Sequence, residues 1–215
     1  MKLGDLVEEI LNIVQDPSID AKKVKSLVND GILEAASRSD TPLPDLEISE
    51  NVETKTDRAW VTLPANYHRK LNFCYSVAQN GRVKILKSLQ HLKSKYPGLI
   101  QTGNVWHVTQ SGGRIYYQGI PSTVDTLTLG YYKLPPILNK DDETPTFLPN
   151  HLHKKLLVNY ACKELFSVIE DGVEGRKVNT SYHEGEGEKA LADLEKFLGP
   201  EQDEPKLIND MLCLS

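Results

Sequence analysis

Cysteine is scarce in this chain of 215 residues, and its three cysteines lie far apart. Cys74, Cys162 and Cys213 never form a CxxC spacing, and an odd number does not suit a set of disulfide pairs. Small secreted domains and zinc sites depend on closely spaced cysteines. The sequence therefore predicts neither a disulfide framework nor a zinc site, and it favours a reducing compartment.

Long hydrophobic runs are missing as well. No stretch approaches the roughly 18 consecutive apolar residues of a membrane span, and Asp5, Glu8 and Glu9 interrupt the first apolar pattern. We therefore expect neither a signal peptide nor a membrane span. With 39% hydrophobic residues and a net charge of -5, the chain is typical of a soluble protein with one domain or two small ones.

The motifs of known catalytic sites are absent too. His151 and His153 lie two residues apart, so on a helix they point about 200° apart and do not converge on one metal ion. The chain contains no P-loop, no GxGxxG after a strand and no GxSxG. The acidic runs at 141–143 and 184–188 lack the ligand spacing of a calcium loop. We predict no catalytic residue, no metal site, no cofactor and no enzymatic activity.

Charge is distributed unevenly along the chain. Segment 66–133 carries nine Lys or Arg and one Asp, whereas the segments before and after it are both negative. Such segregation favours contact between unlike surfaces of neighbouring copies, or contact with nucleic acid. The candidate basic face comprises Arg82, Lys84, Lys87, Lys93, Lys95 and Arg114. A stacking platform for bases could be formed beside it by Trp106, His107, Tyr116 and Tyr117, although aromatic residues alternating in strands are more often part of a core.

Helical patterns occupy both ends of the chain. Apolar residues recur at helical spacing in 3–14 and again from about 20 to 40. A third helix is predicted from Pro149 to a C-terminal stop at Gly172, and a fourth from about Gly175 to Leu198, with a weak point at Gly185 and Gly187. Residues 199–215 read as an acidic linker and an apolar tail too short to fold alone.

Strand patterns occupy the middle of the chain. The apolar period changes from 3.6 to 2 near Val52, and alternation marks about five short strands within 60–132. Asn80 and Gly81 predict a hairpin turn, and 88–96 predicts a short helix. We therefore predict an α+β protein: a four-helix bundle of two N-terminal and two C-terminal helices (1–50 and 149–198), an inserted antiparallel β-module (51–148) and a C-terminal docking tail (199–215).

Several local strings resemble the head-to-tail adaptor, or connector, proteins of short-tailed bacteriophages and related prophages. The string 61–67 resembles that family's strand followed by a Leu-Pro turn and an aromatic residue, and 127–133 resembles its last strand, where two tyrosines precede a basic residue. A second Leu-Pro pair opens the third helix. The positions that carry the resemblance are Leu63, Pro64, Tyr67, Tyr131, Tyr132, Leu148 and Pro149.

The resemblance implies a structural virion protein without a reaction of its own. Its copies would form a ring, a dodecamer in this family, that lies below the portal, extends the DNA channel and attaches the tail. The implied partners are other copies, the portal protein, a tail or nozzle protein and packaged DNA that passes without sequence readout, with no membrane. The protein would be assembled in the host cytoplasm and reside at the head-tail junction of the virion.

Two surfaces are candidates for these contacts. The basic face could line the channel or meet an acidic surface of the next copy. The apolar tail could dock on the portal through Leu207, Ile208, Met211, Leu212 and Leu214. The alternative function is a nucleic-acid-binding module that uses segment 66–133.

Overall fold

The computed structural model describes residues 1–38, 42–171 and 177–199. Its contacts divide the chain into two compact units. The helical unit comprises Met1–Leu43 with Pro136–Ser215, and the sheet unit comprises Pro44–Pro135. The sheet unit is thus inserted between two stretches of chain that fold together.

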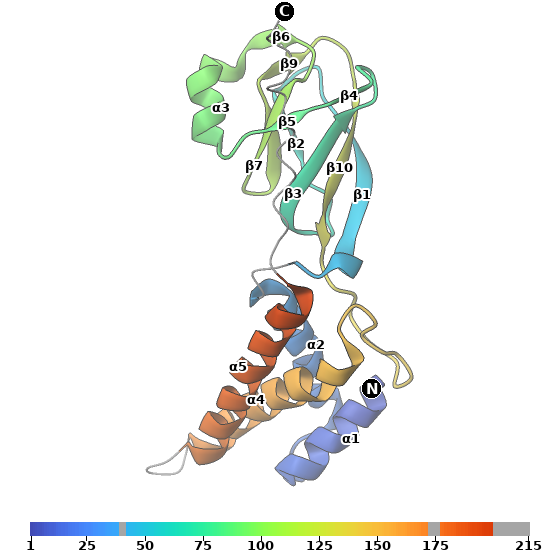
Figure 1. Cartoon of the computed structure of the whole chain (residues 1–215), viewed down its shortest axis with the longest axis vertical. Helices are drawn as coiled ribbons and strands as arrows, with labels where there is room; N and C mark the ends of the chain where they lie inside the picture. Colours follow the sequence, from blue (N-terminus) through green and yellow to red (C-terminus); the bar gives the residue numbers. More distant parts are fainter. Residues whose placement is uncertain (39–41, 172–176, 200–215) are drawn as a thin grey trace, which may run out of the picture. The chain divides into compact units, whose positions relative to one another are not determined.

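The helical unit contains α1 (Leu3–Val14), α2 (Ala21–Arg38), α4 (Asn159–Glu170) and α5 (Val178–Leu198) (Figure 1). Helix α1 buries Leu3, Leu6, Val7 and Ile10, which is the expected 3.6-residue stripe. A 3-10 turn (Asn150–Leu152) and a π-helical turn (Lys154–Val158) lead into α4. Helices α1, α2 and α5 each pack against α4 and against the π-helical turn.

The predicted four-helix bundle with one inserted antiparallel module is wrong. Bundle helices run continuously and nearly parallel to one another, whereas here three helices surround α4 and its interrupted start. The protein is α+β, with five α-helices and ten strands in three sheets among the residues that the structure describes. The apolar spacing of 152–165 fits a helix and a helix with a π-turn equally well, so the sequence could not reveal the interruption.

The sheet unit begins with a 3-10 turn (Pro44–Leu46) and contains two four-stranded sheets and a two-stranded one. The first sheet has the order β1-β10-β3-β4, formed by β1 (Glu47–Glu53), β10 (Thr126–Lys133), β3 (Tyr67–Ser76) and β4 (Gly81–Arg82). The second has the order β2-β8-β7-β5, formed by β2 (Trp60–Thr62), β8 (Arg114–Tyr117), β7 (His107–Ser111) and β5 (Lys84–Ile85). The third pairs β6 (Gln101–Gly103) with β9 (Gly119–Pro121).

Side chains from the first two sheets form one core. Fully buried members include Cys74, Val108, Ile115, Tyr117 and Leu129. The antiparallel prediction fails at two places, because β5 pairs with β7 and β6 pairs with β9 in parallel. Parallel partners need a long connection between them. Between β5 and β7 it includes α3 (Leu89–Lys95) and a 3-10 turn (Pro97–Leu99), and between β6 and β9 it consists of β7, β8 and their loops.

Several local predictions are confirmed. Helix α3 begins at Ser88, whose hydroxyl accepts a hydrogen bond from the backbone N–H of His91 at 3.1 Å. The hairpin joins β3 to β4, and Asn80 adopts a left-handed φ of 49°. The predicted fourth helix is present as α5, but the weak point expected at Gly185 and Gly187 is not seen, because α5 runs without interruption through both. The expected helix ends at Gly172 and Gly175 lie outside the described residues.

Candidate interaction surfaces

Two of the segments that carry the family resemblance, 61–67 and 127–133, meet where β3 pairs with β10. Strand β10 pairs with β3 so that Lys133 faces Tyr67, and the backbone N–H of Leu134 donates to the carbonyl of Asn66 at 2.8 Å. The Tyr67 and Tyr131 rings lie 5.3 Å apart, and the Tyr131 hydroxyl donates to Glu50 at 2.6 Å. Burial and the Glu50 carboxylate raise the pKa of Tyr131. Leu63 is buried, and Pro64 accepts a turn hydrogen bond from Tyr67, so these positions hold the sheet together.

The second Leu-Pro pair shapes the entry into α4. Leu148 is buried and its carbonyl lies 2.9 Å from Nε2 of His153, while the Pro149 carbonyl accepts from the N–H of Leu152. His153 is fully buried, and its Nδ1 lies 2.9 Å from the amino group of Met1. Burial is the main cause that lowers the pKa of His153. A neutral imidazole can accept from Met1 and donate to Leu148, so His153 joins three segments of the helical unit.

Part of the predicted basic face converges on one histidine. Lys84 on β5 stands opposite His107 on β7. The Nζ of Lys95 lies 3.2 Å from Nε2 of His107, and the Tyr96 hydroxyl lies 2.9 Å from Nδ1. Burial, Lys95 and Lys84 all lower the pKa of His107. Like charges are therefore gathered here, at a cost to the isolated subunit.

The other predicted basic residues do not join this cluster. The guanidinium of Arg114 lies 3.9 Å from the centre of the Trp60 ring, and that of Arg58 lies 4.4 Å from it. Arg82 on β4 lies over Phe73 at 5.8 Å. Lys87 and Lys93 are exposed. Among the aromatic candidates, Tyr117 belongs to the core, Tyr116 is half-buried and Trp106 is 54% exposed.

The sheet unit also has an acidic edge, which the sequence analysis did not single out. Strand β1 is the first strand of its sheet, and Glu47, Glu50 and Glu53 on it are exposed. Glu47 accepts a hydrogen bond from the side-chain amide of Asn72 at 2.6 Å. The acidic edge, defined by these three glutamates, and Arg82 on β4 occupy opposite ends of the strand order. In Figure 1 strand β1 lies on one side of this unit, and α3 with β7 lies on the other.

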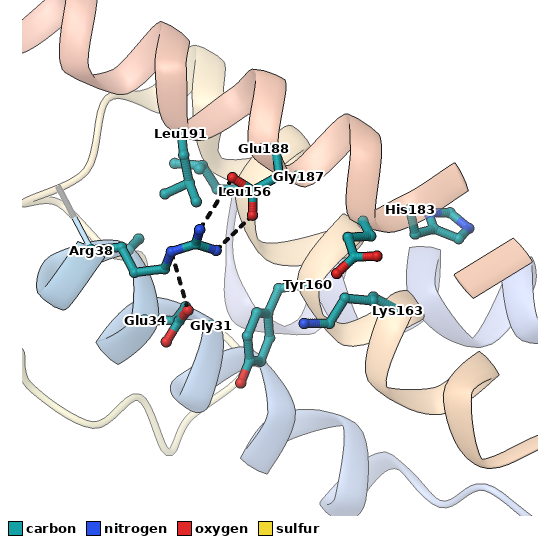
Figure 2. A pocket seen from close by; sticks show the side chains of 12 residues that line it. Gly31, Glu34, Arg38, Leu156, Tyr160, Lys163, His183, Gly187, Glu188 and Leu191 are labelled. Atoms are coloured by element: carbon teal, nitrogen blue, oxygen red, sulfur yellow. Dashed lines mark hydrogen bonds and ion pairs between the residues drawn. The ribbon is translucent and has the colours of Figure 1, made fainter. Parts of the chain in front are cut away.

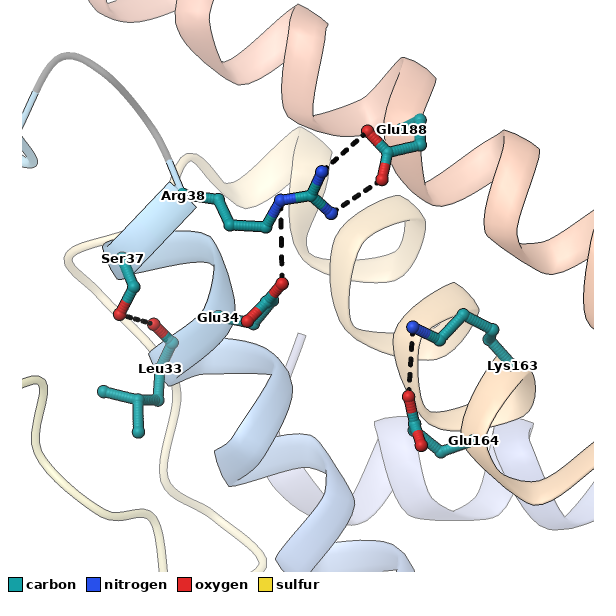
Figure 3. Close-up of polar contacts among 7 residues, drawn as sticks. All are labelled: Leu33, Glu34, Ser37, Arg38, Lys163, Glu164 and Glu188. Atoms are coloured by element: carbon teal, nitrogen blue, oxygen red, sulfur yellow. Dashed lines mark hydrogen bonds and ion pairs between the residues drawn. The ribbon is translucent and has the colours of Figure 1, made fainter. Parts of the chain in front are cut away.

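The helical unit contains a small cleft between α2, α4 and α5 (Figure 2). Arg38 reaches across it and contacts both carboxylate oxygens of Glu188 at 2.6 and 3.2 Å (Figure 3). Glu34 lies 3.6 Å from Nε of the same guanidinium. Gly31 lets the Tyr160 ring approach closely, because a Cβ at this position would lie 2.9 Å from Cδ1 of the ring. At about 60 Å³ the cleft has room for a few water molecules only, so we interpret it as a joint between helices.

Comparison with protein families identifies the chain. The model of the SU10 adaptor protein family matches residues 1–206. The chain belongs to this family. Membership of this family indicates a structural phage protein and a virion component, and it implies interaction with portal and tail proteins in general. No curated protein matches the chain.

Large apolar side chains lie on the surface of the helical unit. Tyr182 and Phe197 on α5 are 62% and 61% exposed. Val168 on α4 and Val178 on α5 are exposed as well. The period of a helix reveals an apolar stripe but not whether a neighbour covers all of it, so the sequence could not show these residues to be accessible.

The predicted docking tail lies outside the described residues. In the part of the chain that the structure describes, no three His, Cys, Asp or Glu side chains come together as metal ligands. No helix within the same residues is long and apolar enough to cross a membrane.

Proposed function

We propose that the adaptor forms a closed ring below the portal by contacts between unlike surfaces of neighbouring copies. The observation that carries this proposal is the separation of charge on the sheet unit, with the acidic edge on β1 and Lys84 and Lys95 gathered around His107. An interface between two different surfaces is heterologous, and it closes into a ring when the rotation between neighbours divides a full turn. Membership of the adaptor family supports the same assembly.

The acidic edge favours unlike partners for a second reason. An edge strand leaves backbone N–H and C=O groups available to another strand. Two β1 strands side by side would bring Glu47, Glu50 and Glu53 against the same glutamates, and like charges across strands are destabilising. A basic surface from the next copy would neutralise them.

The ring, with twelve copies as in the family resemblance, would extend the DNA channel and offer the tail or nozzle protein its attachment surface. Packaged DNA would pass through without sequence readout. The subunit would be made and assembled in the host cytoplasm and remain at the head-tail junction. Particles without it should package DNA and then leak it.

Reversal of charge tests the ring. We expect Glu47→Lys/Glu53→Lys and, separately, Lys84→Glu/Lys95→Glu to lower the rate of ring formation on purified portal by roughly 10-fold to 1,000-fold at low salt. The two variants mixed in equal amounts should form rings again, since each then meets an opposite charge. Native mass spectrometry of adaptor and portal, separately and mixed, measures the complex.

A matched control changes charge elsewhere. Lys22→Glu/Lys23→Glu alters two exposed lysines at the start of α2 and should leave assembly unchanged. The proposal fails if either sheet-unit variant forms rings alone as fast as the unchanged protein, or if portal rings never bind the adaptor.

We further propose that the tail docks on the portal through Leu207, Ile208, Met211, Leu212 and Leu214. Each apolar side chain adds about 1.5 to 3 kcal/mol when fully buried, and the ring repeats the contact in every copy. A chain that ends at residue 199 should bind portal at least roughly tenfold more weakly, because the loss of even one such buried side chain corresponds to about a factor of ten in affinity. Equal binding would assign the tail another role.

The alternative function is nucleic-acid binding by segment 66–133. The specific observation in its favour is that Arg58 and Arg114 lie over Trp60, an arrangement of cations and an aromatic ring that can also hold a phosphate backbone. Titration with duplex DNA at two salt concentrations tests it, since the log-log slope is about -0.9 for each phosphate neutralised. Absence of binding at low salt would remove this alternative.

A further inference from the structure

A second, wider hollow lies on the helical unit. This groove has a volume of about 700 Å³ and runs between the end of α1, the π-helical turn, α4 and α5. Its apolar lining comes from Ile13, Val158, Phe166 and Tyr182, and its charged lining includes Lys154 and Lys155. Ile13 is 37% exposed and Tyr182 is 62% exposed. A volume of this size is comparable to that of a ligand site, but its open, partly apolar lining along a helix suits a peptide better.

The chain leaves α5 at one end of this groove. Phe197 packs edge-on against His151, which lines the groove, with ring centres 5.5 Å apart. Residues 200–215 follow, and an extended segment of that length spans roughly 50 Å at about 3.3 Å per residue. The α5 residues that line the groove lie between Asn179 and Glu186, and the distance along α5 from Phe197 back to Tyr182 is roughly 22 Å at about 1.5 Å per residue. Residues 200–215 are therefore long enough to lie along it.

The order of residues in the segment matches the order of residues in the groove. Acidic residues come first, at Glu201, Asp203 and Glu204, and the apolar residues of 207–214 follow. In the groove, Lys154 and Lys155 lie near the His151 end, in the π-helical turn. Phe166 and Tyr182 lie farther along, where both rings contact His183.

The two lysines already have partners, but these contacts are easily exchanged. Lys154 lies 2.7 Å from Glu9 and Lys155 lies 3.8 Å from Asp193, and the lysine side chains are 57% and 62% exposed. Ion pairs at such exposure contribute little, because water competes for both groups. Glu186, the acidic residue in the groove lining, lies 2.6 Å from Lys189. Carboxylates of the segment can therefore approach this end.

We propose that in the free subunit residues 200–215 fold back into the groove of their own chain. Glu201, Asp203 and Glu204 lie beside Lys154 and Lys155, and the apolar residues that follow cover Phe166 and Tyr182. The same side chains then cannot reach the portal until they leave the groove. This contact goes beyond the proposed function, because it exists before any portal or second copy is present.

Disulfide trapping tests the proposal with a cysteine that the chain already has. Cys74 and Cys162 are fully buried, and burial raises the pKa of each thiol to about 12, so both react slowly. A Tyr182→Cys variant, oxidised at low protein concentration, should form an intrachain disulfide with Cys213. The control is Ala192→Cys, an exposed position ten residues beyond Tyr182 on α5 and about 180° around the helix from His183, which lines the groove. Peptide mapping should show the disulfide at least about tenfold faster for position 182 than for position 192, since docking raises the local thiol concentration.

Equal rates at the two positions would overturn the proposal, as would disulfide-linked dimers from Tyr182→Cys at low concentration, because those place the segment on another copy. A second measurement uses substitutions in the segment and keeps every residue of the groove as it is. Leu207→Asp/Leu212→Asp should shift the NMR signals of Phe166 and Tyr182 toward those of a chain that ends at residue 199, while signals of Glu34 in the small cleft stay in place. Unchanged signals would also overturn it. Neither experiment uses portal, so both can be interpreted even if the ring proposal fails.

Discussion

Charged side chains are arranged differently in the helical unit and in the sheet unit. In the helical unit, ion pairs join different elements: Arg38 on α2 to Glu188 on α5, Lys154 to Glu9, and Lys25 to Asp141. In the sheet unit, like charges stand together, with glutamates along β1 and with Lys84 and Lys95 around His107. The buried polar contacts of the sheet unit include the hydrogen bonds of Asp125 with the hydroxyls of Ser76 and Thr54.

This difference indicates which unit depends on other molecules for its charges. Repulsion among like charges raises the free energy of a separate subunit, and a neighbour of opposite charge removes that cost. The helical unit has its opposite charges within one chain and instead exposes apolar surface at Tyr182 and Phe197. We therefore expect electrostatic contacts from the sheet unit and apolar contacts from the helical unit.

The buried network around Asp125 should give the largest effect. The carboxylate of Asp125 accepts from the Ser76 hydroxyl at 2.6 Å and from the backbone N–H of Ala78 at 3.0 Å, and Asp125 is 6% exposed. Asp125→Ala leaves both donors without this acceptor, and we expect a loss of about 2 to 4 kcal/mol in the free energy of unfolding.

Tryptophan fluorescence during urea unfolding reports on the sheet unit, to which Asp125 belongs, because both tryptophans of the chain, Trp60 and Trp106, lie in that unit. Asp125→Asn is the control, since it keeps an oxygen acceptor and should lose less. An alanine variant within about 0.5 kcal/mol of the unchanged protein would show that water replaces the carboxylate at low cost.

The sequence predicted elements whose signal is local. The stripe of Leu3, Leu6 and Ile10 identified α1, and Asn80 with Gly81 identified the β3-β4 hairpin. It missed β1, because an edge strand with the sequence EISENVE shows little alternation. It missed β6 and β9, because three-residue strands that pair in parallel across a long connection leave no local pattern.

For the candidate surfaces as well, the sequence predicted what depends on local signals and missed what depends on the pairing of distant segments. Counting charges located the basic segment, yet Lys84, Lys95 and His107 meet only because β5 and β7 pair in parallel and α3 packs against β7. The resemblance strings were informative for a physical reason: Asn66, Tyr67 and Tyr131 are neighbours in the fold although they are far apart in the chain.

The ion pair between Arg38 and Glu188 should give a smaller effect than Asp125. Its side chains are 49% and 52% exposed, but the contact uses both carboxylate oxygens. A double-mutant cycle with Arg38→Ala and Glu188→Ala, followed by circular dichroism during urea unfolding, should give a coupling energy of about 0.5 to 1 kcal/mol. Added salt should reduce the coupling, because it screens exposed charges. A coupling above about 2 kcal/mol that salt does not change would mean that this pair resembles the buried network of the sheet unit.

The smallest expected effect is a change with salt in the pKa of two histidines, and it distinguishes the two units most directly. His107 in the sheet unit and His183 in the helical unit both have a pKa lowered mainly by burial. Their charged neighbours act in opposite directions, since Lys95 and Lys84 lower the pKa of His107, whereas Glu170 and Glu186 raise that of His183. Salt screens charges and leaves burial unchanged, so added salt should raise the pKa of His107 and lower that of His183, each by a few tenths of a pH unit.

NMR titration of the imidazole signals at low and high salt measures both shifts in one sample. A folded-state pKa below the unfolded value means that each neutral histidine stabilises the protein above the unfolded pKa of about 6.5, and that this stability is lost as the pH falls below it. Salt should therefore lessen the acid loss due to His107 and increase that due to His183. Lys95→Gln is the control: it should raise the pKa of His107 and weaken its response to salt. Shifts in the same direction for both histidines would contradict the contrast between gathered like charges in one unit and paired opposite charges in the other.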